Sequence, residues 1–456
     1  MERQNFRLQK SSFFSSAIDF FMAFRRSFTD VDCRLLFLIL TPLSLIVFFS
    51  TTIVPEIPFS TFAPLRSFIA GATFQRPRQS NTPTHDSSSF GISPTQPPRG
   101  PVRKKMKIEL QNSKMAVCLV GGARRFEVTG PSVMEKILKE YPNADLFLHS
   151  PLDQNTFKLS YLKTAPKIAA VRIFEPRPIP ETESQLRVLT AKNSPNGIQG
   201  LLQYFHLVEG CLTMIRAYQQ RNNFTYDWVV RTRVDGFWNA PLRPEYFISS
   251  HYVVPSGSSY GGLNDRLGVG DLNTSIVALS RLALISKLDA AGFRQLNSET
   301  AFKAQLTTGG VPFVTMRLPF CIVTERQYEF PPRRFGVPVA AMSSRGPLSG
   351  AKCRPCRAAC EGECVGKVMD SLERGWSWTD WENGTMGLCN ASGDWEMGWE
   401  KIYEDMVGTE TADVSWNNIQ KMKMRECSEG FNEMKRRSGI WDSPNGEEIC
   451  RLGFRI

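Results

Sequence analysis

Residues 115–141 read MAVCLVGGARRFEVTGPSVMEKILKEY, and this stretch decides the fold class. An apolar run is followed by the turn Gly121-Gly122-Ala123-Arg124-Arg125 and then by a segment of helical composition, for which Thr129 is the predicted N-cap. Strand, glycine turn and helix in this order are typical of open α/β sheets, whose ligands meet the strand ends. The turn lacks the full G-x-G-x-x-G pattern and is weak support for a nucleotide site by itself.

Outward from this unit, strand and helix patterns alternate as far as residue 318. Apolar runs predict strands at 144–149, 168–174, 228–231, 252–254 and 312–318. Helical spacing of apolar residues predicts helices at 197–220, 276–291 and 298–306, and residues 256–270 read as a glycine-rich loop. Such alternation implies a mostly parallel sheet with helices on both faces. We therefore predict a Rossmann-like α/β domain over residues 114–344.

The segment YDWVVRTRVDGFW, residues 226–238, carries the first group of site candidates. Arg231, Arg233 and Asp235 are spaced by two residues, so their side chains point to one face of an extended chain. They lie at the end of a buried-type strand, where ligands of open α/β sheets bind. The alternative interpretation is a structural ion pair between Arg231 and Asp235 that caps the strand.

Later segments add titratable candidates. Asp265 lies in GGLNDR and is either a site residue or part of a turn. Glu299 follows Ser298 at a helix start, where it serves as a general base or simply begins the helix. His149 ends a predicted strand and is a further candidate, whereas His206 is expected to pack on its helix. No G-x-S-x-G, H-E-x-x-H or P-loop motif is present, so the corresponding hydrolase, protease and NTPase classes lack support.

The N-terminal part of the chain predicts a membrane anchor. Residues 35–54, LLFLILTPLSLIVFFSTTIV, are uncharged and long enough for the ~30 Å hydrocarbon layer. Arginines before this run place residues 1–34 in the cytosol. A cleaved signal peptide is the alternative, but its apolar core is normally shorter and nearer the start. Residues 55–113 are rich in Pro, Ser and Thr and predict a disordered stem.

The net charge of +11 does not indicate a nucleic-acid partner, because no basic motif with interleaved aromatic residues accompanies it. Four tripeptides beyond the predicted anchor match the N-glycosylation pattern and are compatible with a lumenal location. They begin at Asn223, Asn273, Asn383 and Asn390.

From residue 345 the composition changes to one rich in cysteine and tryptophan, and we treat residues 345–456 as a separate C-terminal subdomain. Its first four cysteines either bind zinc or form disulfides. The absence of a nearby histidine and the predicted lumenal location favour disulfides. The disulfide candidates are Cys353, Cys356, Cys360, Cys364, Cys389, Cys427 and Cys450.

Three segments, CLVGGARRFEVTGPS, YDWVVRTRVDGFW and GGLNDRLGVGD, resemble a family of plant type II membrane proteins whose lumenal region is similar to GT-A-type glycosyltransferases. The resemblance covers about residues 115–330 and implies a nucleotide-sugar transferase fold. It also implies that Asp235 occupies the place of the metal-binding acid in a D-x-D motif, with Mn²⁺ or Mg²⁺ as cofactor. Here Arg233 replaces the first Asp and is expected to supply part of the cation's charge.

We therefore predict a single-pass Golgi glycosyltransferase that moves a sugar from a nucleotide diphosphate to a glycan or glycoprotein acceptor. Asp235 would bind the metal or the sugar nucleotide, and Asp265 or Glu299 would lie on the acceptor side. The alternative is a lumenal glycan-binding or scaffold protein that has the fold without turnover. The residues predicted to bind the nucleotide sugar are Gly121, Gly122, Arg124, Arg125, Arg231, Arg233 and Asp235.

Overall fold

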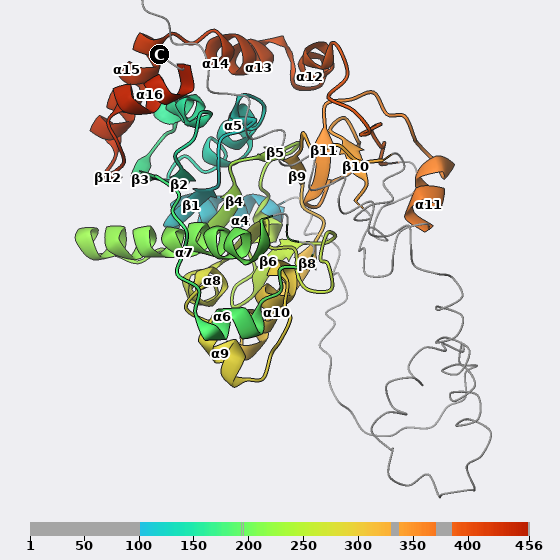
Figure 1. The fold of residues 1–456 in the computed structure, drawn as a ribbon. Coiled ribbons are helices and arrows are strands. Elements are labelled where there is room, and N and C mark those ends of the chain that lie inside the picture. The colour runs from blue at the N-terminus through green and yellow to red at the C-terminus, as the bar shows by residue number, and fades with distance from the viewer. Residues whose placement is uncertain (1–100, 193, 195, 330–336, 371–384, 455–456) are drawn as a thin grey trace, which may run out of the picture. The chain divides into compact units, whose positions relative to one another are not determined.

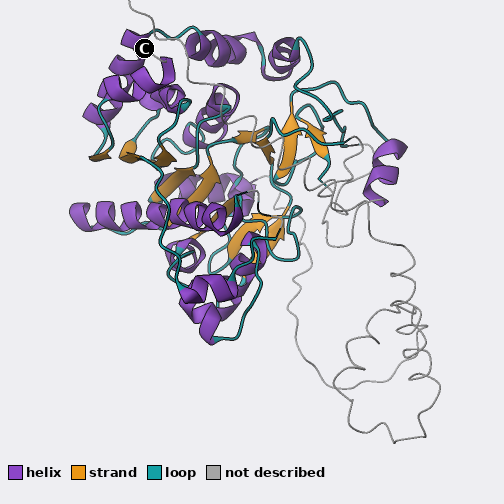
Figure 2. Cartoon of the chain, in the orientation of Figure 1, coloured by secondary structure: helices purple, strands orange, loops and turns teal. Residues whose placement is uncertain are grey.

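The computed structural model describes the chain from residue 101 onward, apart from residues 193, 195, 330–336, 371–384 and 455–456. The described residues belong to one compact unit whose strands lie in two sheets surrounded by helices (Figures 1 and 2). The predicted cytosolic tail, the anchor at 35–54 and most of the stem lie outside these residues. Within the described part of the chain, no helix is both long and apolar enough to cross a membrane.

An eight-stranded sheet forms the centre of the fold in the order β12-β3-β2-β1-β4-β7-β6-β8. Only β7 runs antiparallel to its neighbours in this sheet. This arrangement confirms the predicted mostly parallel α/β sheet. The strands are β1 Met115–Val120, β2 Asp145–Pro151, β3 Ile168–Phe174, β4 Trp228–Arg233, β6 Tyr252–Pro255, β7 Leu267–Asp271, β8 Phe313–Met316 and β12 Ile440–Asp442.

Helices cover both faces of the sheet, as Figure 2 shows. Ala116, Cys118 and Val120 of β1 pack toward α7 (Gly197–Asn222). Met115, Val117 and Leu119 alternate with them and pack in the core on the other face. Because β1 is buried on both faces, its sequence is continuously apolar. The second face is covered by α5 Phe126–Val133, η2 Met134–Leu138, η3 Thr156–Thr164, α15 Met424–Arg437 and α16 Gly446–Phe454.

Two predicted helices differ from the observed ones. Helix α5 begins at Phe126, so Thr129 lies inside it and does not cap it; its hydroxyl donates to the Val234 carbonyl at 2.7 Å. The helix predicted at 276–291 consists of α8 Leu272–Leu279 and α9 Ile285–Ala290. The remaining helices are α4 Pro101–Asn112, α6 Glu183–Val188, η4 Pro244–Tyr246, α10 Ser298–Thr308, α11 Glu363–Asp370, α12 Trp399–Val407, α13 Thr409–Ala412, η5 Asp413–Asn417 and α14 Asn418–Gln420.

Strand β7 lies in the segment that the sequence predicts as a glycine-rich loop. A Cβ atom at Gly268 or Gly270 would collide with the ring of Tyr252 on the neighbouring strand β6. The glycines therefore make room for the tyrosine within the sheet, and their presence here does not mark a loop.

A second sheet has four strands in the order β10-β11-β9-β5. Strands β5 (Gly236–Trp238), β9 (Phe320–Val323) and β10 (Val339–Ala341) lie before residue 345, and β11 (Ala351–Arg354) lies after it. Strand β12 also lies after residue 345, and it pairs with β3 in the central sheet. The predicted separate subdomain at 345–456 is therefore wrong, because its strands complete both sheets.

Helix α4 occupies the last part of the predicted stem. Leu110 is buried, and Lys107 forms an ion pair with Glu140 at 2.6 Å. The prediction of a disordered stem up to residue 113 is therefore wrong for this helix.

Among the described residues, five disulfides connect ten cysteines: Cys118–Cys211, Cys321–Cys353, Cys356–Cys389, Cys360–Cys364 and Cys427–Cys450. All seven predicted candidates are among them, which confirms the disulfide interpretation. The clustered cysteines divide among three bridges, so they do not form the alternative zinc site. Cys118, Cys211 and Cys321 were not predicted as disulfide cysteines, because they lie within apolar strands and a helix.

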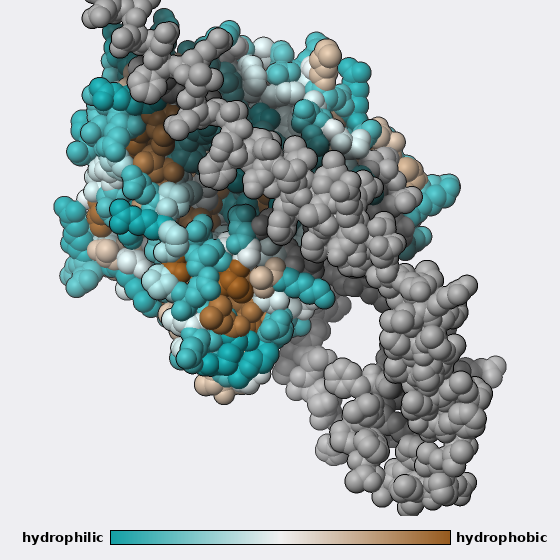
Figure 3. All heavy atoms as spheres, viewed as in Figure 1, coloured by the Kyte–Doolittle hydropathy of each residue, from teal (hydrophilic) through white to brown (hydrophobic). Residues whose placement is uncertain are grey.

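The surface seen in Figure 3 is mostly hydrophilic, with apolar atoms in small separate patches. Three of the predicted glycosylation sites, Asn223, Asn273 and Asn390, are exposed, and Asn383 lies outside the described residues. Their modification stays a prediction.

Candidate functional site

The carboxyl ends of β1 and β4 lie side by side, because Val120 pairs with Arg233 in the parallel ladder. Strand β7 is antiparallel to β4 and begins beside Thr232. Asp265 and Arg266 precede β7, so they lie beside the carboxyl ends of β1 and β4. The strand order changes direction at this point, with β2 on one side of β1 and β4 on the other. Ligands of open α/β sheets bind at such a switch point.

Asp235 follows β4 and is held by Arg233. The Nε and Nη2 atoms of Arg233 donate to the two carboxylate oxygens at 2.8 and 2.6 Å. Burial raises the pKa of Asp235, but the charges of Arg233, Lys352 and Arg124 together lower it below its usual range. Asp235 is therefore ionised, and the ion pair that the sequence suggested with Arg231 is formed with Arg233.

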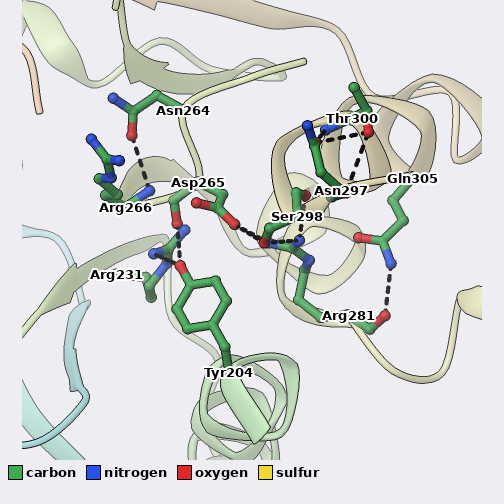
Figure 4. Close-up of polar contacts among 10 residues, drawn as sticks. All are labelled: Tyr204, Arg231, Asn264, Asp265, Arg266, Arg281, Asn297, Ser298, Thr300 and Gln305. Carbon is green, nitrogen blue, oxygen red and sulfur yellow. Dashed lines mark hydrogen bonds and ion pairs between the residues drawn. The ribbon is translucent and has the colours of Figure 1, made fainter. Parts of the chain in front are cut away.

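Arg231 and Arg281 are fully buried beside Tyr204 of α7 (Figure 4). The Tyr204 hydroxyl accepts from Arg231 Nη1 at 3.3 Å and donates to the Asp265 carbonyl at 2.5 Å. Among the described residues, Nε and Nη2 of Arg231 and Nε of Arg281 have no hydrogen-bond partner. Two guanidinium groups thus lie in the interior with part of their donor capacity unused.

Asp265 is the carboxylate of this buried group. It accepts from the Ser298 hydroxyl and, at 3.3 Å, from Arg281 Nη1, and its side chain is 5% exposed. Burial raises the pKa of Asp265, but Arg281, the Ser298 hydroxyl and the nearby arginines lower it overall. Asp265 therefore balances Arg281 and fixes the loop before β7, while its acceptor-side role stays a prediction.

Glu299 begins α10 beside this group and is half-buried. Its carboxyl group accepts a hydrogen bond from its own backbone N–H and has no ion-pair partner in the part of the chain that the structure describes. Burial and, next, the charge of Asp265 raise the pKa of Glu299 to about 8. The carboxyl group is therefore mainly protonated at neutral pH.

Three cations near this group, Arg266, Arg281 and Lys352, were not among the site residues predicted from the sequence. Arg266 is buried and its Nη1 donates to the Gly350 carbonyl at 2.6 Å. Lys352 lies in β11, where it pairs with Ile322 of β9, which in turn pairs with Gly236. Burial, Arg266 and Arg233 lower the pKa of Lys352 well below its usual range. The sequence signal that could have identified Lys352 is the presence of a lysine within an otherwise buried strand.

Among the described residues, positive charge exceeds negative charge at these strand ends. The described carboxyl groups that lie there are those of Asp235, Asp265 and Glu299, and Glu299 has a raised pKa. Removing an ion from water costs several kcal/mol, so buried charges are normally paired. The surplus therefore suits an anion that carries more than one negative charge. We call the five cations the cation cluster: Arg231, Arg233, Arg266, Arg281 and Lys352.

Comparison with known proteins places this geometry within a family. A family model described as a domain of unknown function, DUF7796, matches residues 110–456. The chain belongs to the DUF7796 family. The match includes both sheets and the whole cation cluster. No curated protein matches the chain.

The glycine turn of the DUF7796 domain brings one of its two arginines to the site. Gly121 has a φ of 118°, a conformation that favours glycine, and it redirects the chain after β1. The exposed Arg124 lies near enough to lower the pKa of Asp235. Gly122 contacts the Asp153 side chain closely, since an added Cβ would lie 3.1 Å from its carboxylate oxygen.

The second arginine of the glycine turn, Arg125, is bound by residues outside the site. Its contacts connect the turn to the C-terminal region of the DUF7796 domain. It forms ion pairs with Glu325 and, at 3.4 Å, with Glu127. Its guanidinium group lies 4.0 Å from the centre of the Trp395 ring, and Trp395 packs edge-on against Trp399 at 4.7 Å. The predicted diphosphate role of Arg125 is therefore not supported by its contacts, and these tryptophans serve packing.

His149 is a core residue of the DUF7796 domain and does not belong to the site. Its Nδ1 lies 2.8 Å from the Leu207 carbonyl of α7, and Gly210 leaves room for its ring. Burial lowers its pKa to about 4, so it is neutral at physiological pH.

The residues at Asp235 do not fit the divalent cation that the resemblance implies. Both carboxylate oxygens accept from Arg233, and the other charges acting on Asp235 come from Lys352 and Arg124. Mg²⁺ and Mn²⁺ prefer free oxygen ligands and negative surroundings. In the described ranges, no group of three or more His, Cys, Asp or Glu side chains is arranged to hold a metal ion.

A cavity of about 600 Å³ lies at the opposite edge of the DUF7796 sheet, at the amino ends of β1, β2 and β3. It is lined by Lys114, Asp145, Lys167, Tyr218 and Arg437 among others. It shares no residue with the cation cluster and lies away from the carboxyl ends of the strands, where ligands of open α/β sheets bind.

Proposed function

We propose that the protein transfers a sugar from a nucleoside-diphosphate sugar to a glycan or glycoprotein acceptor. The observation that carries the proposal is the surplus positive charge of the cation cluster at the switch point of a mostly parallel sheet. A nucleoside diphosphate concentrates several negative charges over two phosphate groups, and Arg and Lys are the side chains that bind phosphate.

In this proposal the acceptor oxygen bonds to the anomeric carbon while the bond from that carbon to the diphosphate oxygen breaks. The electron pair leaves with the diphosphate, and the cation cluster stabilises the charge as it develops. The acceptor proton passes to a carboxylate. Glu299 takes this role in the fraction of molecules in which it is ionised. Its pKa of about 8 makes it a stronger base than Asp265, whose carboxylate is engaged by Arg281.

The proposed location is the Golgi membrane, with the described region in the lumen. The five disulfides favour an oxidising compartment, and the predicted anchor at 35–54 would tether the chain there. The sequence resemblance to GT-A-type glycosyltransferases agrees with a sheet of this class, and a GT-A-type fold is part of the proposal.

The test is transfer from a panel of radiolabelled nucleotide sugars to glycan acceptors by the full-length protein. Arg233→Met removes a charge from the leaving-group side and is expected to lower kcat about 100-fold or more. The matched control is Arg436→Met, since Arg436 pairs with Glu433 on α15 at the surface and its loss is expected to leave activity unchanged. A wild-type protein without transfer from any donor, or full activity in Arg233→Met, would overturn the proposal.

A further inference from the structure

We propose that Lys352 and Arg266 neutralise the diphosphate of the donor in place of a divalent cation. This inference rests on the proposed function and names the residues that bind its leaving group.

The backbone of the second sheet aims Lys352 at the site. Cys353, the next residue in β11, packs in the core cluster that includes Phe237 and Leu388, so Lys352 points to the opposite face. Its ladder partner Ile322 belongs to the core of the central sheet. Lys352 therefore extends from the second sheet toward the central sheet. Two strand spacings, about 10 Å, separate its Cα from that of Gly236, which follows Asp235.

Lys352 has positive neighbours and no anion of its own. Its ammonium group forms no hydrogen bond or ion pair among the described residues. Arg266 and Arg233 both disfavour its charge, and the nearby carboxylate of Asp235 is engaged by Arg233. A bound diphosphate would supply the missing negative charge and favour the charged form of the lysine.

Arg266 is fixed next to Lys352 by the segment that leads into β11. Its guanidinium donates to the Gly350 carbonyl at 2.6 Å. Asn264 donates to the Ser349 carbonyl at 3.3 Å and accepts from the Arg266 backbone N–H at 3.1 Å. The loop before β7 and the start of β11 are therefore held together, so both cations are positioned before a ligand arrives. Such preorganised charge acts without a cost of rearrangement.

The same contacts explain why a metal is not needed. In a D-x-D site, two carboxylates hold the cation. Here Arg233 replaces the first of them, and it donates hydrogen bonds to both oxygens of the second, Asp235. A divalent cation would have to displace Arg233 and enter a region of surplus positive charge. The protein cations already supply the charge that the diphosphate requires.

The experiment measures binding of UDP, GDP and ADP to the full-length protein by calorimetry, first in EDTA and then with Mn²⁺. We expect at least one of these nucleotides to bind in EDTA. Lys352→Met is expected to weaken that binding about 10- to 100-fold, the range for a lost charge-assisted contact, while Lys352→Arg retains most of it. The control Lys435→Met changes an exposed lysine of α15 and should bind as the wild type does. Thermal unfolding of each variant verifies the fold.

The outcomes separate the inference from the proposed function. Binding that requires Mn²⁺ would overturn the inference and leave the transferase proposal standing. Equal binding in EDTA by Lys352→Met and the wild type would remove Lys352 from the site. Failure of all three nucleotides to bind with and without Mn²⁺ would count against the proposed function itself, and the inference would fail with it.

Discussion

Replacing Asp265 with asparagine is expected to destabilise the protein by about 3–5 kcal/mol. The Arg281 guanidinium is fully buried, and its Nη1 lies 3.3 Å from an Asp265 carboxylate oxygen. At an effective dielectric constant of about 20, two unit charges at this distance attract by about 5 kcal/mol. Asparagine keeps the size of the side chain and can still accept from Ser298, so the variant removes mainly the charge.

The assay is urea unfolding of the full-length protein, followed by tryptophan fluorescence and far-UV circular dichroism. The double variant Asp265→Asn/Arg281→Met removes the buried cation together with its partner. It is expected to be at least ~2 kcal/mol more stable than Asp265→Asn alone, because Arg281 is no longer left as a buried charge without its partner. A loss of this size is a large share of the ~5–15 kcal/mol by which domains are stable.

The control for burial is Asp442→Asn. Asp442 pairs with Arg172 at a similar distance, 3.2 Å, but its side chain is 69% exposed. Exposed pairs contribute about 0–1 kcal/mol, so this variant should lose little. Equal losses in Asp265→Asn and Asp442→Asn, or a double variant no more stable than Asp265→Asn, would refute the argument from burial.

Three further predictions concern stability. The pKa of Glu299 is about 8 in the folded protein and 4.5 when unfolded, so its contribution to stability should fall as pH rises between these values, by at most about 1.4 kcal/mol per pH unit. In urea titrations, the stability of the wild type relative to Glu299→Gln should therefore decline over this range. Replacing both Cys427 and Cys450 with alanine opens a bridge between residues 23 apart and should cost about 3 kcal/mol, measured by calorimetry under non-reducing conditions. Gly210→Ala places a Cβ against the His149 ring and should cost about 1–3 kcal/mol in thermal unfolding.

The central strands were predictable because burial on both faces leaves a direct pattern in the sequence. MAVCLV and IAAVRIF give β1 and β3 with their observed bounds, Met115–Val120 and Ile168–Phe174. Strand β7 was not predictable from composition, because Gly268 and Gly270 are dictated by the bulk of Tyr252 on another strand. The second sheet combines short strands from distant segments, so no local pattern marks it.

The candidate site was predictable as a position but not as a set of partners. The spacing of Arg233 and Asp235 after a buried strand indicated the strand ends at which the cation cluster lies. Arg231 donates to Tyr204 and lies near Asp265, and both of these residues come from other elements of the fold. The pairing of Asp235 with Arg233, and not with Arg231, therefore depends on contacts between distant segments. Lys352 reaches the site only through its pairing in the second sheet, a contact that local sequence does not encode.

The outer edge of β3 is closed by β12, although Ile440 and its partner Ala170 are about 270 residues apart. A ribosome that adds about 5–20 residues per second needs roughly 10–50 s to synthesise that interval. During this time the nascent chain exposes an unpaired strand edge, which invites association with other chains. A premature stop codon upstream of residue 440 would make that exposure permanent, so truncated products should depend on chaperones and be degraded, even with the cation cluster intact.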